Sequence, residues 1–167
     1  MATKASSTTK ARRKHAHGHD THKIKMPKHI KNTCFGCGVD NPDGMKLKFF
    51  VDEEKQQTVC HFRLTKKYQG PPGHSHGGII ATILDEAMGK VNKLRHVIAL
   101  TKTMNIEYMR PVPLRQALTA VGYEKSVEGR KHLNAAEIRN QAGEVLARCE
   151  GLFIAVDAEA MFKKYVR

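Results

Sequence analysis

The sequence has no long hydrophobic run and few cysteines. None of its apolar stretches reaches the length of about eighteen residues that a membrane-spanning helix needs, and no apolar segment follows the charged residues at its start, so neither a transmembrane span nor a secretory signal is expected. The four cysteines, Cys34, Cys37, Cys60 and Cys149, are too few and too unevenly spread for a disulfide framework in a chain of 167 residues. The sequence therefore favours a soluble cytoplasmic protein with reduced thiols.

Acidic residues are scarce at one end of the chain. Residues 1–33 contain nine of the 29 lysines and arginines but only one of the 16 acidic residues, and they hold five of the ten histidines. Few large apolar side chains occur there, so burial cannot offset the entropy lost on ordering. We expect a basic, His-rich and disordered tail, for which contact with nucleic acid or with an anionic membrane surface is an alternative to simple solvation.

The remaining residues, 34–167, have the pattern of one folded domain. Apolar residues at spacings of three and four predict a long, largely covered helix over 79–94. Alternation of apolar and polar residues predicts strands in the regions 45–51, 60–64, 96–108, 117–125, 131–140 and 145–156, and a short terminal helix is expected over 158–165. One long helix among about six strands with short turns implies an α+β domain, in which an antiparallel sheet curls around the helix.

The segment 68–89 joins a turn-rich loop to the start of the predicted helix. The loop brings His76, Gly77 and Gly78 to that start, and Asp85 follows about two turns later in an otherwise apolar stretch. An isolated acid in such a place is a catalytic carboxylate with a perturbed pKa, a charge paired with an unseen base, or an outward-facing residue. The pattern by itself leaves these three interpretations open.

Three motifs along the chain resemble those of a known family. They are Cys34-Phe35-Gly36-Cys37-Gly38 with Asn41 to Leu47 after it, His76-Gly77-Gly78 with Asp85 nine residues after the histidine, and NIEYMRPVP at 105–113. Together they are similar to the hotdog-fold acyl-CoA thioesterases of the phenylacetate-pathway (PaaI-like) type. The resemblance covers residues 34–156. It implies a hotdog fold, hydrolysis of an acyl-CoA thioester, and a homodimer or homotetramer with active sites at the subunit interface.

The resemblance also implies roles for individual residues. Asp85 acts as general base on water or as nucleophile, the backbone N–H of Gly77 polarises the thioester carbonyl, and Thr101 supplies a hydroxyl from the partner subunit. His76 either bonds the backbone at the helix start or takes part directly, and Glu86 is the substitute if Asp85 is inert. The chemistry agrees, because N–H groups at a helix start stabilise an oxyanion and partial burial raises a carboxyl pKa toward that of a useful base. No cofactor and no metal is then required.

Further residues are candidates for binding the substrate. Asn41 and Gly78 belong to the motifs near the expected active site. Arg130 and Lys131 lie in a predicted turn, where they can meet the phosphates of coenzyme A as charge-assisted donors. The floor of the pocket is expected to come from residues of the helix and of a partner strand, such as Ile80, Leu84 and Met104. Aryl and medium-chain acyl groups both stay open as substrates.

The Cys34-x-x-Cys37 pair invites comparison with zinc sites. A structural zinc site needs four ligands, and Cys60 lies in a predicted strand without a partner cysteine at a suitable spacing. Histidines of the tail offer further ligands, but the composition bias of that segment explains them more simply. The sequence therefore favours a tight turn that opens the first strand over a metal site.

Two functions of other classes compete with hydrolysis. One is a non-catalytic acyl-CoA-binding hotdog protein, a kind of regulator that carries a DNA-binding domain, although residues 1–33 lack the apolar pattern of a helix-turn-helix. The other is an interaction protein tethered by its basic tail, for which deletion of residues 1–33 should abolish partner binding. A hydratase is less well supported, because the Asp/His dyad pattern of hotdog hydratases is not apparent.

Overall fold

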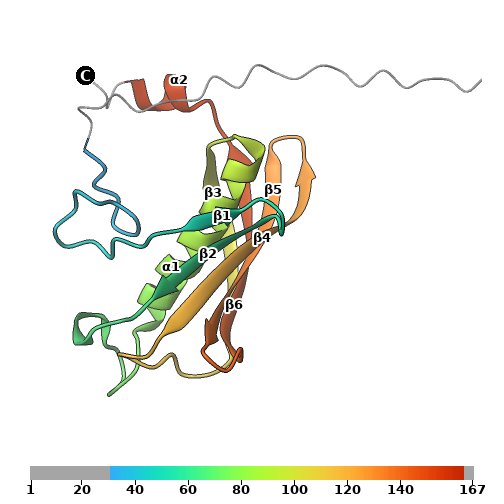
Figure 1. Cartoon of the computed structure of the whole chain (residues 1–167). Coiled ribbons are helices and arrows are strands. Elements are labelled where there is room, and N and C mark those ends of the chain that lie inside the picture. Colours follow the sequence, from blue (N-terminus) through green and yellow to red (C-terminus); the bar gives the residue numbers. More distant parts are fainter. Residues whose placement is uncertain (1–30, 164–167) are drawn as a thin grey trace, which may run out of the picture.

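The computed structural model describes residues 31–163, so the prediction of a disordered tail falls almost entirely outside the described residues. The strands are β1 (Phe50–Asp52), β2 (Gln57–Phe62), β3 (Ala99–Tyr108), β4 (Leu118–Glu128), β5 (Lys131–Asn140) and β6 (Val145–Ala155). The helices are α1 (Gly77–Val91) and α2 (Ala158–Phe162), with the short 3-10 segments η1 (Lys66–Tyr68) and η2 (Asn92–Arg95). The predicted order of two strands, a helix and four strands is confirmed (Figure 1). None of the helices in this part of the chain is long and apolar enough to cross a membrane.

A single antiparallel sheet surrounds α1. Its strand order is β1-β2-β4-β5-β6-β3, and every neighbouring pair is antiparallel. The sheet curls around α1, which lies across its concave face (Figure 1). The expected α+β fold, a sheet wrapped around one long helix, is therefore confirmed. Strand β3 forms one edge of the sheet and packs beside α1.

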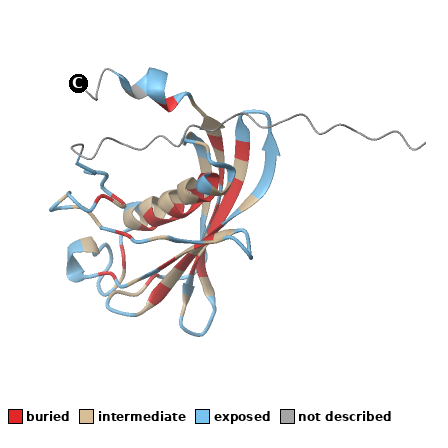
Figure 2. Ribbon diagram, turned by 45° about the horizontal axis from the view of Figure 1, so that its top comes forward, coloured by how far each residue is buried: buried red, intermediate tan, exposed pale blue. Residues whose placement is uncertain are grey.

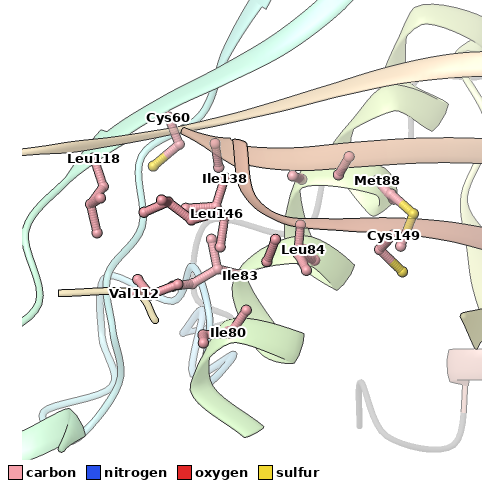
Figure 3. Packing of buried hydrophobic residues seen from close by; sticks show 14 of the residues in the cluster. Cys60, Ile80, Ile83, Leu84, Met88, Val112, Leu118, Ile138, Leu146 and Cys149 are labelled. Atoms are coloured by element: carbon pink, nitrogen blue, oxygen red, sulfur yellow. The ribbon is translucent and has the colours of Figure 1, made fainter. Parts of the chain in front are cut away.

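Apolar residues at helical spacing hold α1 against the sheet. The buried positions of the helix are Ile80, Ile83, Leu84, Ala87, Met88 and Val91. Figure 2 shows buried residues along the helix and the strands behind it, and Figure 3 shows the cluster that the helix forms with Leu118, Ile138, Leu146 and Cys149 of the sheet. Burial of each large aliphatic side chain contributes about 1.5–3 kcal/mol. This packing fixes the rotation of α1, and it leaves Asp85 at the margin of the core.

Strand β4 approaches α1 so closely that it has room only for glycine at one position. A Cβ atom on Gly122 would overlap the Ala87 carbonyl oxygen. The Thr58 hydroxyl on the neighbouring strand β2 donates a hydrogen bond to that same oxygen at 2.9 Å. These two contacts fix the distance between the backbone of α1 and strands β2 and β4.

The first strand is shorter than the pattern predicted. The sequence predicted it over 45–51, but β1 covers only Phe50–Asp52. The residues before it bond to the preceding turn instead, because the Met45 N–H donates to the Phe35 carbonyl at 2.8 Å and the Leu47 N–H to the Gly36 carbonyl at 2.9 Å. Apolar and polar residues do alternate over 45–51, but the backbone N–H groups at the start of this segment are already bonded to the preceding turn and cannot pair with a strand.

Candidate active site

The start of α1 is capped by a histidine. His76 has extended backbone angles, φ −65° and ψ 140°, and its Nδ1 accepts the Gly78 N–H at 2.9 Å. The loop before it is tied down by the His76 N–H, which donates to the Tyr68 carbonyl at 2.9 Å. Of the two roles predicted for His76, the structure shows the helix cap. Because the cap engages the Gly78 N–H, that group is not free to bind substrate.

The cap leaves the N–H of Gly77 as a free donor at the first position of α1. This N–H meets no hydrogen-bond acceptor among residues 31–163, as is usual for the first turn of a helix. Tyr108, at the end of β3, donates from its hydroxyl to the Gly77 carbonyl at 3.2 Å. A Cβ atom on Gly77 would lie 3.7 Å from that tyrosine ring. Sequence reasoning assigned no role to Tyr108, although it lies in the NIEYMRPVP motif.

Asp85 is held by a hydroxyl from a strand of the same chain. Thr101 Oγ1, near the start of β3, donates to Asp85 Oδ1 at 2.7 Å. The resemblance assigned this hydroxyl to a partner subunit, and in that respect the structure differs from the expectation. The reason is topological, since β3 follows α1 closely in the chain and packs beside it. Asp85 and Thr101 are therefore brought together without a second chain.

The surroundings of Asp85 shift its ionisation. Burial raises the pKa of this carboxyl, the Thr101 hydrogen bond acts to lower it, and the negative charge of Glu86 raises it; the net pKa is above its ordinary value. A carboxylate whose pKa is raised in this way is a stronger base than an exposed one. Asp85 is thus neither an outward-facing acid nor one half of a tight ion pair.

Residues 72–147 match the family model of the thioesterase superfamily. This segment includes the His76 cap of α1, Asp85, Thr101 and Tyr108. The chain belongs to the thioesterase superfamily. It is 32% identical over 126 residues to acyl-coenzyme A thioesterase THEM4 of Bos taurus, an alignment that covers 75% of this chain and 52% of that protein. The chain spans about half the length of the curated thioesterases that it matches.

Solved structures of superfamily members share the fold. The thioesterase superfamily protein RHA08564 superposes with a TM-score of 0.70 at 34% identity, covering 74% of this chain and 60% of that one. The E. coli PaaI protein from the phenylacetic acid degradation operon gives a TM-score of 0.61 at 20% identity, covering 66% and 79%. The predicted hotdog fold and the predicted membership in the thioesterase superfamily are confirmed.

A groove in the superfamily domain opens beside Gly77. It has a volume of about 400 Å³, and its lining includes His74, Ile80, Tyr108, Met109 and Val112. Within one chain, two other residues predicted to form the pocket floor do not line this groove. Leu84 is completely buried in the core, and Met104 packs against that core.

The predicted phosphate-binding residues lie far from this groove within one chain. Arg130 donates from Nε to the Ala155 carbonyl at 2.9 Å, and Lys131 lies 3.9 Å from the Glu128 carboxylate. Ala155 pairs with Ala99 at the start of β3, whereas Tyr108 contacts Gly77 at its other end. The ten residues of β3 span about 30 Å. One chain therefore does not bring Arg130 and Lys131 to Gly77.

Asn41 stabilises its own turn. Its amide donates to the Thr33 carbonyl at 3.0 Å and its side-chain oxygen accepts the Asp43 N–H at 3.0 Å. Contact between Asn41 and substrate stays a prediction.

Glu86, considered as a substitute for Asp85, has a different environment. Its side chain is only 16% exposed and forms an ion pair of 3.2 Å with Lys90. Burial acts to raise the pKa of Glu86, but Lys90 and the Cys37 and Cys34 thiols outweigh it and hold the pKa below its ordinary value. The lowered pKa makes Glu86 a weaker base than Asp85.

Proposed function

We propose that this domain hydrolyses an acyl-CoA thioester to a free carboxylic acid and coenzyme A. The observation that carries the proposal is the partly buried Asp85 carboxylate, which has a raised pKa and is oriented by Thr101 at 2.7 Å. The free N–H of Gly77 on the same helix adds a donor suited to an oxyanion. The name of the related bovine protein, acyl-coenzyme A thioesterase, supports the class of substrate.

The proposed reaction uses these two groups in turn. Asp85 removes a proton from water as the water oxygen attacks the thioester carbon, and the carbonyl oxygen becomes an anion that accepts the Gly77 N–H. Collapse of this intermediate breaks the C–S bond, and the departing thiolate takes the proton back from Asp85. The alternative is attack by Asp85 itself, which gives a mixed anhydride that water then hydrolyses. If water attacks the Asp85 carbonyl of the anhydride, a single turnover in heavy-oxygen water leaves the label in Asp85 and an Asp85 oxygen in the product, which the direct route does not do.

One chain cannot supply both groups to the same thioester. Gly77 and Asp85 are eight residues apart on α1, which corresponds to about 12 Å along a helix axis. Reacting atoms need to approach to about 3–3.5 Å, and an aspartate side chain closes only a small part of the difference. We therefore propose that the active site combines Gly77 of one chain with Asp85 of another, in a homodimer or a pair of such dimers.

The edge of the sheet supports such an assembly. Among residues 31–163, strand β3 is hydrogen-bonded to β6 on one side only. It carries Thr101 and Tyr108, the residues that contact Asp85 and Gly77. Its long unpaired edge is suited to pairing with another strand. Association along β3 would place the two ends of α1 from different copies near one another.

Release of free thiol from a panel of acyl-CoAs tests the proposed function. We expect turnover by the wild-type protein and a loss of roughly 10²–10⁴-fold in kcat for Asp85→Asn, because the amide cannot act as a base. Asp43→Asn, in an exposed turn, is the matched control and should keep the wild-type rate. A wild-type protein that binds acyl-CoA without releasing thiol would instead be a non-catalytic binder. Full activity of Asp85→Asn would show that the base is assigned to the wrong residue.

A further inference from the structure

A second cluster of reactive side chains lies directly beside Asp85 and takes no part in the proposed hydrolysis. The Cys34 thiol donates to Glu86 Oε1 at 3.2 Å, and Lys90 Nζ donates to Cys37 Sγ at 2.9 Å. One ligand atom each from Cys34, Cys37 and Glu86 lies within 4.8 Å of the other two. Two thiols and a carboxylate therefore converge on one point, although Cys34 and Glu86 are 52 residues apart in the chain.

The fold holds these groups in place. Gly36 is buried between the two cysteines, and a Cβ atom on it would lie 2.5 Å from the Glu86 side chain. The turn is closed by the Gly38 N–H, which donates to the Cys34 carbonyl at 2.9 Å. The Glu86 and Lys90 side chains are only 16% and 22% exposed. The turn 34–38 is thus pressed onto α1, with its thiols facing the carboxylate.

This set of donors matches the ligand preference of zinc. Zn²⁺ binds thiolate sulfur at about 2.3 Å and carboxylate oxygen at about 2.0–2.2 Å in tetrahedral sites, and two cysteines separated by two residues are a typical pair among its ligands. Ligand atoms around such an ion are about 3.5 Å apart, so atoms already within 4.8 Å of one another need only a small movement to close around it. The cluster also attracts cations already, because the Lys90 ammonium lies between the Cys37 sulfur and the Glu86 carboxylate.

We propose that Cys34, Cys37 and Glu86 bind one divalent ion of the zinc class, with water as the fourth ligand. The two thiols lose their protons to solvent as the ion binds, so one divalent cation replaces two protons and the net charge of the cluster does not change. Lys90 leaves Glu86 and stays as an N–H donor to the Cys37 thiolate, a common outer-shell contact of metal sites. The bound ion would fasten the turn 34–38 to α1 next to the base.

This proposal revises the interpretation of the cysteine pair that the sequence favoured. The objection to a metal site was the lack of further ligands at a suitable spacing. The structure supplies a third ligand from α1, a helix that no sequence spacing relates to the turn. The proposal does not depend on hydrolysis, since Asp85 is not among the ligands.

Cobalt substitution in the full-length, reduced protein tests the site. Co²⁺ bound by cysteine gives an intense thiolate-to-cobalt charge-transfer absorption in the near ultraviolet, which histidines of residues 1–33 and carboxylates cannot produce. We expect this absorption to saturate at one ion per chain. It should disappear in Cys34→Ser and in Cys37→Ser, and it should remain in the controls Cys149→Ser and Lys90→Gln.

The third ligand is tested by affinity. Glu86→Gln should weaken Co²⁺ binding by more than the roughly 10–100-fold that loss of an outer-shell partner causes, and excess Zn²⁺ should bleach the cobalt absorption. No charge-transfer absorption in the wild-type protein, or absorption that survives both cysteine substitutions, would overturn the proposal. Unchanged affinity in Glu86→Gln would remove Glu86 from the site and likewise overturn it. Melting curves of each variant exclude unfolding as the cause of a lost signal.

Discussion

Asp85 combines partial burial with a single hydroxyl partner. Burial alone would favour its protonated form strongly, whereas the Thr101 hydroxyl stabilises the ionised form and holds one carboxylate oxygen in place. A base needs both features, since it has to be ionised near neutral pH and still hold a proton in the transition state. The Thr101 hydroxyl on β3 therefore limits the rise in the pKa of Asp85 that burial causes.

The pH profile of hydrolysis tests this pairing. Activity needs ionised Asp85, so in protein freed of metal by a chelator the rate should fall as the pH drops through the raised pKa of Asp85. Thr101→Val removes a hydrogen bond that lowers this pKa, so the acid limb of kcat against pH should move to higher pH. Thr101→Ser keeps the hydroxyl and should retain the wild-type limb. An unmoved limb in Thr101→Val would mean that the hydroxyl does not tune Asp85.

At the scale of the element, α1 has two functions. Its buried face packs in the core, and its first turn provides the free N–H of Gly77. The helix begins at Gly77 because His76 caps it with its own ring nitrogen. The apolar periodicity predicted the helix only from Ile79. The cap is a side-chain interaction that periodicity does not record, although His76-Gly77-Gly78 stood out as a motif.

The Gly77 N–H can be removed without breaking the helix. Proline is tolerated at the first helical position, and His76 already has the extended angles that a residue before proline prefers. Gly77→Pro should therefore fold but lose about 10²–10³-fold in kcat, the usual loss for one oxyanion donor. Gly77→Ala keeps the N–H, and its methyl group would lie 3.7 Å from Tyr108, so it should keep most of the activity. Equal rates for the two variants would exclude this N–H as the oxyanion donor.

A pair of glycine substitutions tests how closely α1 packs against the sheet. Gly122→Ala pushes a methyl group into the Ala87 carbonyl oxygen, and overpacking of this kind lowers the free energy of unfolding by about 1–3 kcal/mol. Gly89→Ala, on α1 itself, meets only an ordinary contact of 3.8 Å with Phe153, and alanine is favoured over glycine in helices by about 0.8–1 kcal/mol. The urea concentration at the midpoint of unfolding should therefore fall for Gly122→Ala and rise for Gly89→Ala. A stable Gly122→Ala variant would show that the helix has room to move.

At the scale of the whole molecule, a single chain separates the proposed oxyanion donor from the proposed base. Within one chain α1 keeps Gly77 and Asp85 about 12 Å apart along its axis, and β3 separates Arg130 and Lys131 from the groove at Gly77 by most of its length. The proposed site is complete only if copies of the chain associate. Dimer and activity are therefore expected to be lost together on dilution.

Mixing two inactive variants tests the shared site. Gly77→Pro and Asp85→Asn are each expected to be nearly inactive alone, but a mixed dimer contains one site with an intact Gly77 and an intact Asp85. Random exchange of subunits in an equal mixture should restore roughly a quarter of the wild-type activity, since half of the dimers then hold one good site of two. Subunit exchange is demonstrated separately by native mass spectrometry of the mixture, because a wild-type and Asp85→Asn mixture keeps half of the activity with or without exchange. No recovery after demonstrated exchange would place both groups of a site in one chain.

The sequence by itself determined the elements and the groups that can react. Periodicity predicted one long helix and six strands, β5 with its observed bounds, and the motifs singled out Gly77 and Asp85. These features are local, because helical and strand patterns and turn residues repeat over a few positions. Tertiary structure alone decided that Thr101 meets Asp85 within one chain, that β1 starts late, and that Glu86 lies against two cysteines 49 and 52 residues before it. Contacts of that kind depend on which surfaces pack together and on which backbone groups are already hydrogen-bonded, and no repeat along the chain encodes either.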